Sequence, residues 1–347
     1  MPSIPTVTFS PLDLAGAAFS SPLFSLIIAL VAAGGFALIA SRPGRGRTRL
    51  VSGEFAASVR TRYAPEHRAL GVTALGVTVV FIAEVVIRGY VITDQTLWWW
   101  RFAVPITCAI VGVCLVFGLI VTRGTTPPEA PVLPAVRRTW ASFSSRSLLM
   151  MAGLTFVALL ATTVAGGIAS SPNGEGQYVW LTIPIPNEPG IDPIRLPFYG
   201  WAYGAPVLLA LAVLVAVTWA TLDRNAARTY LRPETIAPER VARRETARNT
   251  TLIATAAVLL TLAGAWRLIA SAGSGSFLTI TGQNADAPYD AAWRFSELAV
   301  AAGWCAPILE VIAFAVLLLI GADGLRPKTA MHSSAPSEAP SNADALL

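Results

Sequence analysis

Charged residues are scarce in this chain of 347 residues: Asp, Glu, Lys and Arg together make up 13% of the sequence. Soluble domains usually carry about a quarter charged residues, and no polar stretch here is long enough to build a separate soluble domain. The hydrophobic fraction is 54%, and long uncharged runs hold most of it. The composition therefore predicts an all-α polytopic membrane protein.

Histidine, cysteine and lysine are also rare. His67 and His332 lie outside the apolar runs, which excludes paired histidine ligation of haem within the bilayer. The three cysteines lie inside apolar runs and are expected to be buried small hydrophobic residues rather than a redox pair or a metal site. The chain has no HExxH, CxxC or GxSxG and no nucleotide-binding motif. We therefore expect a protein that is not an enzyme, with no catalytic residue, metal or cofactor.

Seven runs of about 20 apolar residues are each long enough to cross a bilayer as a helix. They cover about residues 22–40, 69–89, 102–122, 147–169, 202–222, 250–270 and 298–321. They predict one membrane domain, 22–326, preceded by an extracytoplasmic segment, 1–21. This segment has no Lys or Arg, so it lacks the basic part of a signal peptide. The Ser-, Pro- and Ala-rich tail, 327–347, is expected to be a disordered cytoplasmic segment.

Lysine and arginine are distributed unevenly between the loops. Twenty of the 25 lie in the segments 41–68, 123–146, 223–249 and 322–347. Because cytoplasmic loops carry the excess of Lys and Arg, we expect the N-terminus outside and the C-terminus inside. The arginines thus lie where the topology requires them, and we expect no nucleic-acid partner. The pattern indicates a multi-pass protein of the bacterial cytoplasmic (inner) membrane.

An internal repeat is predicted from three prolines spaced by 101 residues, Pro105, Pro206 and Pro307. Each is preceded by an extended segment: Tyr90–Thr93, Trp180–Ile183 and Phe277–Ile280. Further upstream lies a Pro-Glu pair: Pro65-Glu66, Pro128-Glu129 and Pro238-Glu239. Three copies in one order predict one helix followed by three helical hairpins. In this interpretation the Pro-Glu pair begins the outward helix, and the later proline lies in the first turns of the inward helix.

The expected outer loops carry strand-like and aromatic residues. Segments 180–186 and 191–197 flank the turn sequence 187–190, which predicts a hairpin whose prolines restrict it to edge or irregular pairing. Together with loop 271–297, this hairpin is expected to form a small extracytoplasmic cap. Trp98-Trp99-Trp100 and other aromatic residues near the outer span ends are expected to form an interfacial belt. A ligand-stacking platform is the alternative for the tryptophan cluster.

Two acids lie inside the predicted spans. Glu310 lies near the middle of the seventh span, where a charged carboxylate costs about 2.5–3.5 kcal/mol on insertion scales, so it should face protein or water. Glu84 precedes Arg88 by four residues, which permits an ion pair on one helix face. Arg267 is available as a partner for either acid. These four residues are the candidate intramembrane polar site, either a path for protons or a cationic group, or a structural contact between helices.

Residues 233–249 are highly charged and predicted to be helical. This helix either leads into the sixth span or docks a partner protein, and the candidate docking residues are Glu239, Arg240, Arg243 and Arg244. We expect a non-catalytic membrane subunit of a transport or export assembly, surrounded by lipid and by other protein subunits, with a separate ATPase as one partner. The alternative is a structural or accessory subunit of another membrane complex, or an envelope sensor.

Overall fold

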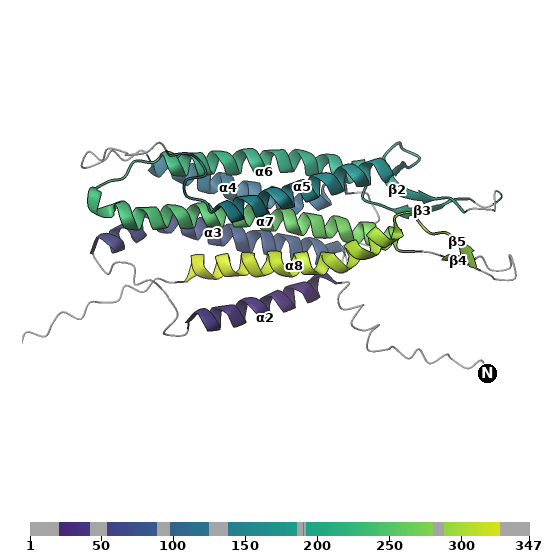
Figure 1. Ribbon diagram of the computed structural model, residues 1–347, viewed down its shortest axis with the longest axis horizontal. Coiled ribbons are helices and arrows are strands. Elements are labelled where there is room, and N and C mark those ends of the chain that lie inside the picture. Colours follow the sequence, from purple (N-terminus) through teal and green to yellow (C-terminus); the bar gives the residue numbers. More distant parts are fainter. Residues whose placement is uncertain are drawn as a thin grey trace, which may run out of the picture.

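The computed structural model describes residues 21–41, 54–88, 98–124, 138–185, 190, 192–275, 277–279 and 288–326. Within these ranges the molecule is an elongated helical bundle with two small β-sheets at one end (Figure 1). The expected N-terminal segment up to residue 20, the C-terminal tail, Tyr90–Thr93 and Pro128-Glu129 lie outside the described residues.

Seven described helices are long and apolar enough to cross a membrane. They are α2 (Pro22–Ser41), α3 (Glu54–Val86), α4 (Val104–Arg123), α5 (Arg146–Ala169), α6 (Trp201–Ala227), α7 (Ile236–Gly273) and α8 (Ser296–Leu325). Two 3₁₀ helices, η2 (Arg101–Ala103) and η3 (Pro233–Thr235), directly precede α4 and α7. The prediction of a mostly helical protein with seven apolar helices is confirmed.

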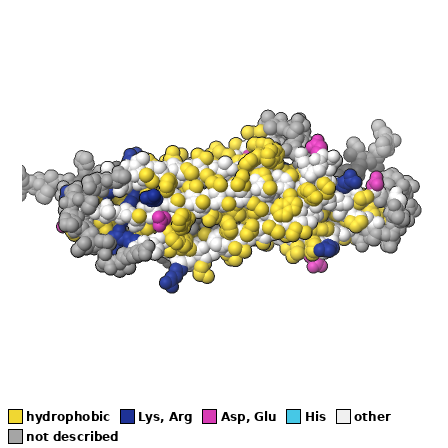
Figure 2. Space-filling model, turned by 90° about the horizontal axis from the view of Figure 1, so that it is seen from above, with side chains coloured by type: hydrophobic (Ala, Val, Ile, Leu, Met, Phe, Trp, Pro, Cys, Tyr) yellow, Lys and Arg dark blue, Asp and Glu magenta, His cyan; other side chains and the backbone are white. Residues whose placement is uncertain are grey.

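The surface of the bundle matches the inside of a bilayer. Helices satisfy their own backbone hydrogen bonds, which lipid cannot do, and large apolar side chains remain exposed, such as Val31 (72%), Leu154 (71%) and Ile168 (75%). In Figure 2 hydrophobic side chains cover the middle of the visible face, while Lys and Arg lie toward its two ends. The described helices are therefore in contact with a lipid bilayer.

Helix α7 is the centre of the bundle. It contacts α3, α4, α5, α6 and α8, and 61% of its apolar segment is buried, against 11% for α2 and for α5. Helix α2 lies at the edge of the bundle and packs mainly on α8 (Figure 1). The consecutive pairs α3–α4, α5–α6 and α7–α8 each contact one another, as hairpins must, but the threefold repeat remains a prediction.

Helix α3 begins well before the apolar run that predicted it. It starts at Glu54, so Pro65 lies inside the helix, and the prediction that Pro65-Glu66 begins a helix is wrong. The residues before Pro65 are more polar, but they extend the helix on the N-terminal side of the apolar run, because a helix can form without an apolar environment. Pro238, in contrast, is the third residue of α7, in its first turn.

The three prolines of the predicted repeat take different positions in their helices. Pro105 is the second residue of α4, Pro206 the sixth of α6 and Pro307 the twelfth of α8. The prediction that all three lie in the first turns is therefore wrong for Pro307. Helix α8 begins at Ser296, and Glu297 in its first turn favours the helix dipole, so Pro307 lies about three turns into the helix.

Both sheets lie at the same end of the bundle, called the sheet end below (Figure 1). Strands β1 (Ser171–Pro172), β2 (Tyr178–Ile183) and β3 (Ile194–Pro197) form an antiparallel sheet in this order. The predicted hairpin is present, with Ile183 opposite Ile194 and Trp180 opposite Pro197. Strands β4 (Phe277–Thr279) and β5 (Pro288–Asp290) form the second sheet. Thus two of the three extended segments noted in the sequence contribute strands.

Small residues bring the helices into close contact. The Cα atoms of Gly71 on α3 and Gly324 on α8 lie so near that a Cβ atom on Gly324 would come within 2.8 Å of the Gly71 backbone. On α4, a Cβ atom at Gly112 would overlap the Thr73 side chain of α3. Because lipid is as apolar as the helices, such close packing supplies much of the attraction between them.

We predict that Gly112→Ala destabilises the protein, because the added methyl group forces α3 and α4 apart. Overpacking of this kind costs about 1–3 kcal/mol. Gly118→Ala on the same helix is the matched control, since a Cβ atom there meets nothing within 4 Å, and alanine favours a helix over glycine. Thermal unfolding in detergent should show a lower midpoint for Gly112→Ala alone; equal midpoints for the two variants would contradict the prediction.

Candidate functional site

A cavity of about 1100 Å³ lies between α2, α3, α4, α7 and α8. Along α7 it extends from Leu260 to Ser274, a distance of about 21 Å at 1.5 Å per residue. Most of its lining residues are apolar, but four are charged: Glu84, Arg101, Arg267 and Glu310. The structure therefore gathers three of the four residues of the predicted polar site around one cavity, and the fourth, Arg88, contacts Glu84.

Arg267 and Glu310 form a two-pronged ion pair that joins α7 to α8. Arg267 Nε donates to Glu310 Oε1 at 2.6 Å, and Nη2 donates to Oε2 at 2.7 Å. The Glu310 side chain has no exposed surface, and that of Arg267 is 18% exposed. Two parallel charge-assisted hydrogen bonds are the strongest way to hold a buried carboxylate. The pair neutralises the acid that the sequence places in the middle of its span.

Glu84 and Arg88 form the ion pair that their spacing permits. The Arg88 Nε and Glu84 Oε1 atoms are 2.6 Å apart, although the groups are not aligned for a hydrogen bond. The Arg88 guanidinium also lies over the ring of Trp98, 4.8 Å from its centre, which adds a cation–π attraction. This second pair joins Glu84 of α3, which lines the cavity, to Arg88 just after the end of the same helix, so it does not join two helices.

Arg101 is the cavity residue that sequence analysis missed. Its guanidinium carbon lies 4.4 Å from the centre of the Phe102 ring and 5.8 Å from that of Tyr203. Arg101 forms no ion pair within 4 Å and no side-chain hydrogen bond with any residue in the described ranges, but it lies close enough to Glu84 for their opposite charges to attract. In the sequence, Arg101 directly follows Trp98-Trp99-Trp100. An arginine at such a predicted membrane boundary is interpreted as one of the loop charges that set the topology, so it was not considered as a cavity residue.

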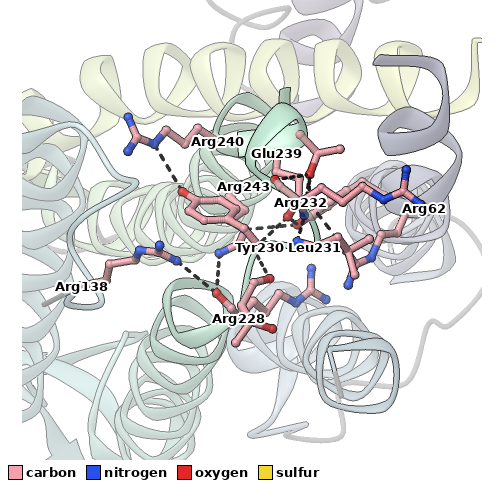
Figure 3. A network of polar contacts seen from close by, with 12 residues as sticks. Arg62, Arg138, Arg228, Tyr230, Leu231, Arg232, Glu239, Arg240 and Arg243 are labelled. Atoms are coloured by element: carbon pink, nitrogen blue, oxygen red, sulfur yellow. Dashed lines mark hydrogen bonds and ion pairs between the residues drawn. The ribbon is translucent and has the colours of Figure 1, made fainter. Parts of the chain in front are cut away.

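A second polar site lies at the opposite end of the bundle, called the basic end below (Figure 3). At its centre is Arg243 of α7, whose side chain is completely buried. Arg243 donates to the carbonyl oxygens of Arg228 and Thr229 at 2.7 and 2.8 Å, to Tyr63 Oη at 3.1 Å and to Glu239 Oε2 at 3.1 Å. These bonds tie α3, α7 and the segment after α6 together.

The carboxylate of Glu239 completes this network from the same helix. Its Oε1 accepts hydrogen bonds from Thr235 Oγ1 at 2.8 Å and from the Leu231 backbone at 3.3 Å. Nearby, Arg228 donates to both oxygens of Glu66 on α3, at 2.7 and 3.1 Å. Buried charges thus hold the connection from α6 to α7, together with the buried ring of Tyr230, on which the Arg243 guanidinium stacks.

The predicted docking residues divide into two groups. Glu239 and Arg243 have no exposed side-chain surface, so their prediction as partner contacts is corrected: they hold the fold together. Arg240 and Arg244 are exposed, and Arg244 also lines a second cavity of about 690 Å³ beside the start of α5, together with Arg248 and four serines. The sequence could not separate these groups, because a buried and an exposed arginine look alike when both sit in a charged helix.

Groups suited to metal binding are absent from the described part of the chain, where no three His, Cys, Asp or Glu side chains cluster. The three cysteines are free thiols. Cys108 is partly buried, whereas Cys114 and Cys305 are exposed on the apolar surface, so the expectation of burial is wrong for these two because their helix faces point away from the bundle.

The comparisons with known proteins give no relative: no family model, no curated protein and no solved structure matches the chain. No relative therefore assigns a function to the cavity or to either polar site.

We predict that Arg243→Met strongly destabilises the fold, because the buried Glu239 carboxylate loses the guanidinium that hydrogen-bonds to it and keeps only that of Arg62, whose Nη1 atom lies 3.9 Å from Glu239 Oε1. Removing one partner of a buried pair typically costs about 3–5 kcal/mol. Arg244→Met, one residue further along α7 and exposed, is the matched control. Denaturant unfolding in detergent should separate the two variants; similar stabilities would show that the network is dispensable.

We predict that Arg267→Met destabilises the protein more than the double variant Arg267→Met/Glu310→Met does. The single change leaves a carboxylate buried without its cation, whereas the double change removes both charges. Thermal midpoints in detergent measure the difference. A double variant less stable than the Arg267 single variant would mean that Glu310 contributes to stability independently of Arg267.

Proposed function

We propose that the chain is a non-catalytic membrane subunit of a transport or export assembly in the bacterial inner membrane. The observation that carries this proposal is the charged cavity between α2, α3, α4, α7 and α8. The cavity, of about 1100 Å³, is partly open to the surface of the bundle, so a molecule can enter it. A cavity with charged groups in apolar walls is suited to holding a molecule on its way across or out of the bilayer.

The orientation in this proposal follows from the loops. The sheet end faces outside and the basic end faces the cytoplasm, in keeping with the excess of Lys and Arg there. The two small sheets then form the proposed extracytoplasmic cap at the outer end of the bundle. The uneven charge of the loops supports this arrangement.

The basic end is the proposed contact surface for a cytoplasmic subunit such as an ATPase. Arg240, Arg244 and Arg248 are exposed on the first turns of α7, and the buried network around Arg243 fixes the helix that carries them. A rigid basic surface suits a partner with an acidic surface, because complementary charges steer the encounter. The chain has no nucleotide-binding motif of its own, so energy for transport would come from such a partner.

The second candidate is a structural or accessory subunit of another membrane complex. The observation that favours it is the Arg267–Glu310 pair, in which each charge satisfies the other. A pair of this geometry can act purely as a contact between α7 and α8. In that case Glu310 would matter for stability and have no separate role.

The proposal is tested by purifying the tagged full chain from native membranes in a mild detergent and identifying what remains bound. We expect an ATPase and at least one further membrane subunit. Arg240→Glu/Arg244→Glu should release the ATPase while the membrane subunits stay, because the reversed charges repel an acidic surface. Arg60→Glu, an exposed arginine near the start of α3 at the same end, is the matched control.

Three outcomes count against the proposal. If no ATPase is recovered, the ATPase-linked version fails. If the Arg60 control releases the ATPase equally, Arg240 and Arg244 are not its docking site. If a defined complex is recovered and deleting the chain dissolves that complex without a change in any flux, the accessory function is correct instead.

A further inference from the structure

The second cavity, of about 690 Å³ at the basic end, lies between the start of α5 and the first half of α7. Two arginines, four serines and four apolar residues line it, and none of these lining residues is acidic. Arg244 and Arg248 are exposed, and neither side chain forms an ion pair within 4 Å or a hydrogen bond in the described ranges. The walls of this cavity therefore carry positive charge without a described counter-charge.

Arg244 and Arg248 lie one turn apart on the same face of α7, about 6 Å along its axis. Like charges at this spacing repel each other. Glu245, the acid between them in the sequence, is close to α3 instead, where its Oε2 lies 3.1 Å from Nε2 of His67. An anion held by both guanidinium groups would turn the repulsion between them into attraction to a shared charge.

The start of α5 adds hydrogen-bond donors to the opposite wall. Ser145 caps the helix, since its Oγ accepts a hydrogen bond from the Leu148 backbone at 3.3 Å. The backbone N–H groups of Arg146 and Ser147 have no partner within the helix, and they donate to no other described residue. The first turn contains no acid, so no side chain there neutralises the positive end of this 24-residue helix.

Ser144 adds a hydroxyl group to this wall. It lines the cavity, and its Oγ atom is buried without a hydrogen-bond partner in the described residues. A buried hydroxyl that makes no hydrogen bond costs free energy, so an oxygen of a ligand would stabilise it. The neighbouring Phe143 packs near the buried Arg243, whose guanidinium carbon lies 6.0 Å from the ring centre. The wall therefore rests on the buried network of the basic end, and little ordering is needed when a ligand binds.

The cavity reaches the level at which the lipid-facing surface begins. Leu148, Met151 and Leu252 line it, and the nearby Met150 and Leu154 of α5 are 75% and 71% exposed. Large exposed apolar side chains on a membrane-spanning helix lie against lipid. Both a lipid headgroup and a soluble molecule can therefore approach the two exposed arginines.

We propose that this cavity binds a phosphate group, with Arg244 and Arg248 on one side and the first turn of α5 on the other. Phosphate suits these walls better than a carboxylate, because its oxygens point in several directions and meet donors of both helices. Guanidinium groups and helix N-termini both bind phosphate readily. The ligand is a phosphate ester, carried either by a lipid headgroup or by a soluble molecule. The inference does not depend on the proposed function, although Arg244 also belongs to the proposed contact surface.

The first test is calorimetric titration of the purified full chain in detergent with glycerol phosphate, and with acetate as the reference anion. We expect acetate to bind at least about tenfold more weakly than glycerol phosphate, because a carboxylate cannot satisfy both walls. Arg248→Gln should weaken glycerol phosphate binding by about tenfold or more. Arg240→Gln is the matched control, since Arg240 is exposed on the same helix but outside the cavity, and it should leave binding unchanged.

A second variant tests the inference even if Arg248→Gln does not fold. Ser147→Glu places a carboxylate on the cavity wall at the positive end of α5, where it takes the position of the bound anion. We expect a higher thermal midpoint for this variant and no further rise with glycerol phosphate, whereas glycerol phosphate should stabilise the unchanged chain. Ser147→Gln, which has nearly the same size and no charge, should respond to glycerol phosphate as the unchanged chain does.

A third measurement identifies the source of the phosphate. Native mass spectrometry compares phosphatidic acid with phosphatidylcholine of identical acyl chains, each in competition with glycerol phosphate. Phosphatidic acid that binds more tightly than both phosphatidylcholine and glycerol phosphate assigns a lipid headgroup, because acyl chains then add contacts with the apolar surface. Equal binding of phosphatidic acid and glycerol phosphate assigns a soluble ester. Either result supports the phosphate site.

The inference is overturned if neither glycerol phosphate nor phosphatidic acid binds, or if Arg240→Gln weakens binding as much as Arg248→Gln does. It is also overturned if acetate binds as tightly as glycerol phosphate, which would mean a site for any anion, or if Ser147→Glu and Ser147→Gln behave alike. All of these measurements use the isolated chain, so they do not depend on the recovery of an ATPase complex.

Discussion

A charge buried among transmembrane helices needs its partner inside the protein, because lipid offers neither counter-ions nor hydrogen bonds. Helix α7 carries two such charges. It carries Arg243 near one end and Arg267 near the other, 24 residues and so about 36 Å apart. Arg243 thus ties one part of the central helix to α3, and Arg267 ties another part to α8.

The two arginines are satisfied in different ways, and the difference separates their roles. Arg243 is enclosed and binds backbone carbonyl oxygens as well as Glu239. It therefore holds the connection between α6 and α7 in place. Arg267 is partly exposed to a cavity and binds the carboxylate of a neighbouring helix. A side-chain pair can exchange its partner for a ligand or a water molecule, which backbone carbonyls within a fixed turn cannot do.

The sequence predicted the features that depend on residues close together in the chain. Apolar runs of sufficient length predicted the seven helices, and the four-residue spacing predicted the Glu84–Arg88 pair. Hydropathy marks where the apolar run begins rather than where a helix begins, so the start of α3 at Glu54, well before the predicted span 69–89, was missed. Arg243 and Tyr63 lie 180 residues apart in the chain, and no periodicity relates them. The burial of Glu239 and the position of Arg101 at the cavity also depend on residues that are distant in the chain and come together only in the fold.

Helix α2 differs from the rest of the bundle in one respect: between Pro22 and Ser41 it has no charged residue at all. It packs mainly on α8 and contributes Pro22 and Ile28 to the cavity wall. Its attachment is therefore made of dispersion contacts, which have no preferred direction and are matched by contacts with lipid tails. Displacing α2 from α8 would therefore break no described ion pair, and it would uncover the part of the cavity that Pro22 and Ile28 line.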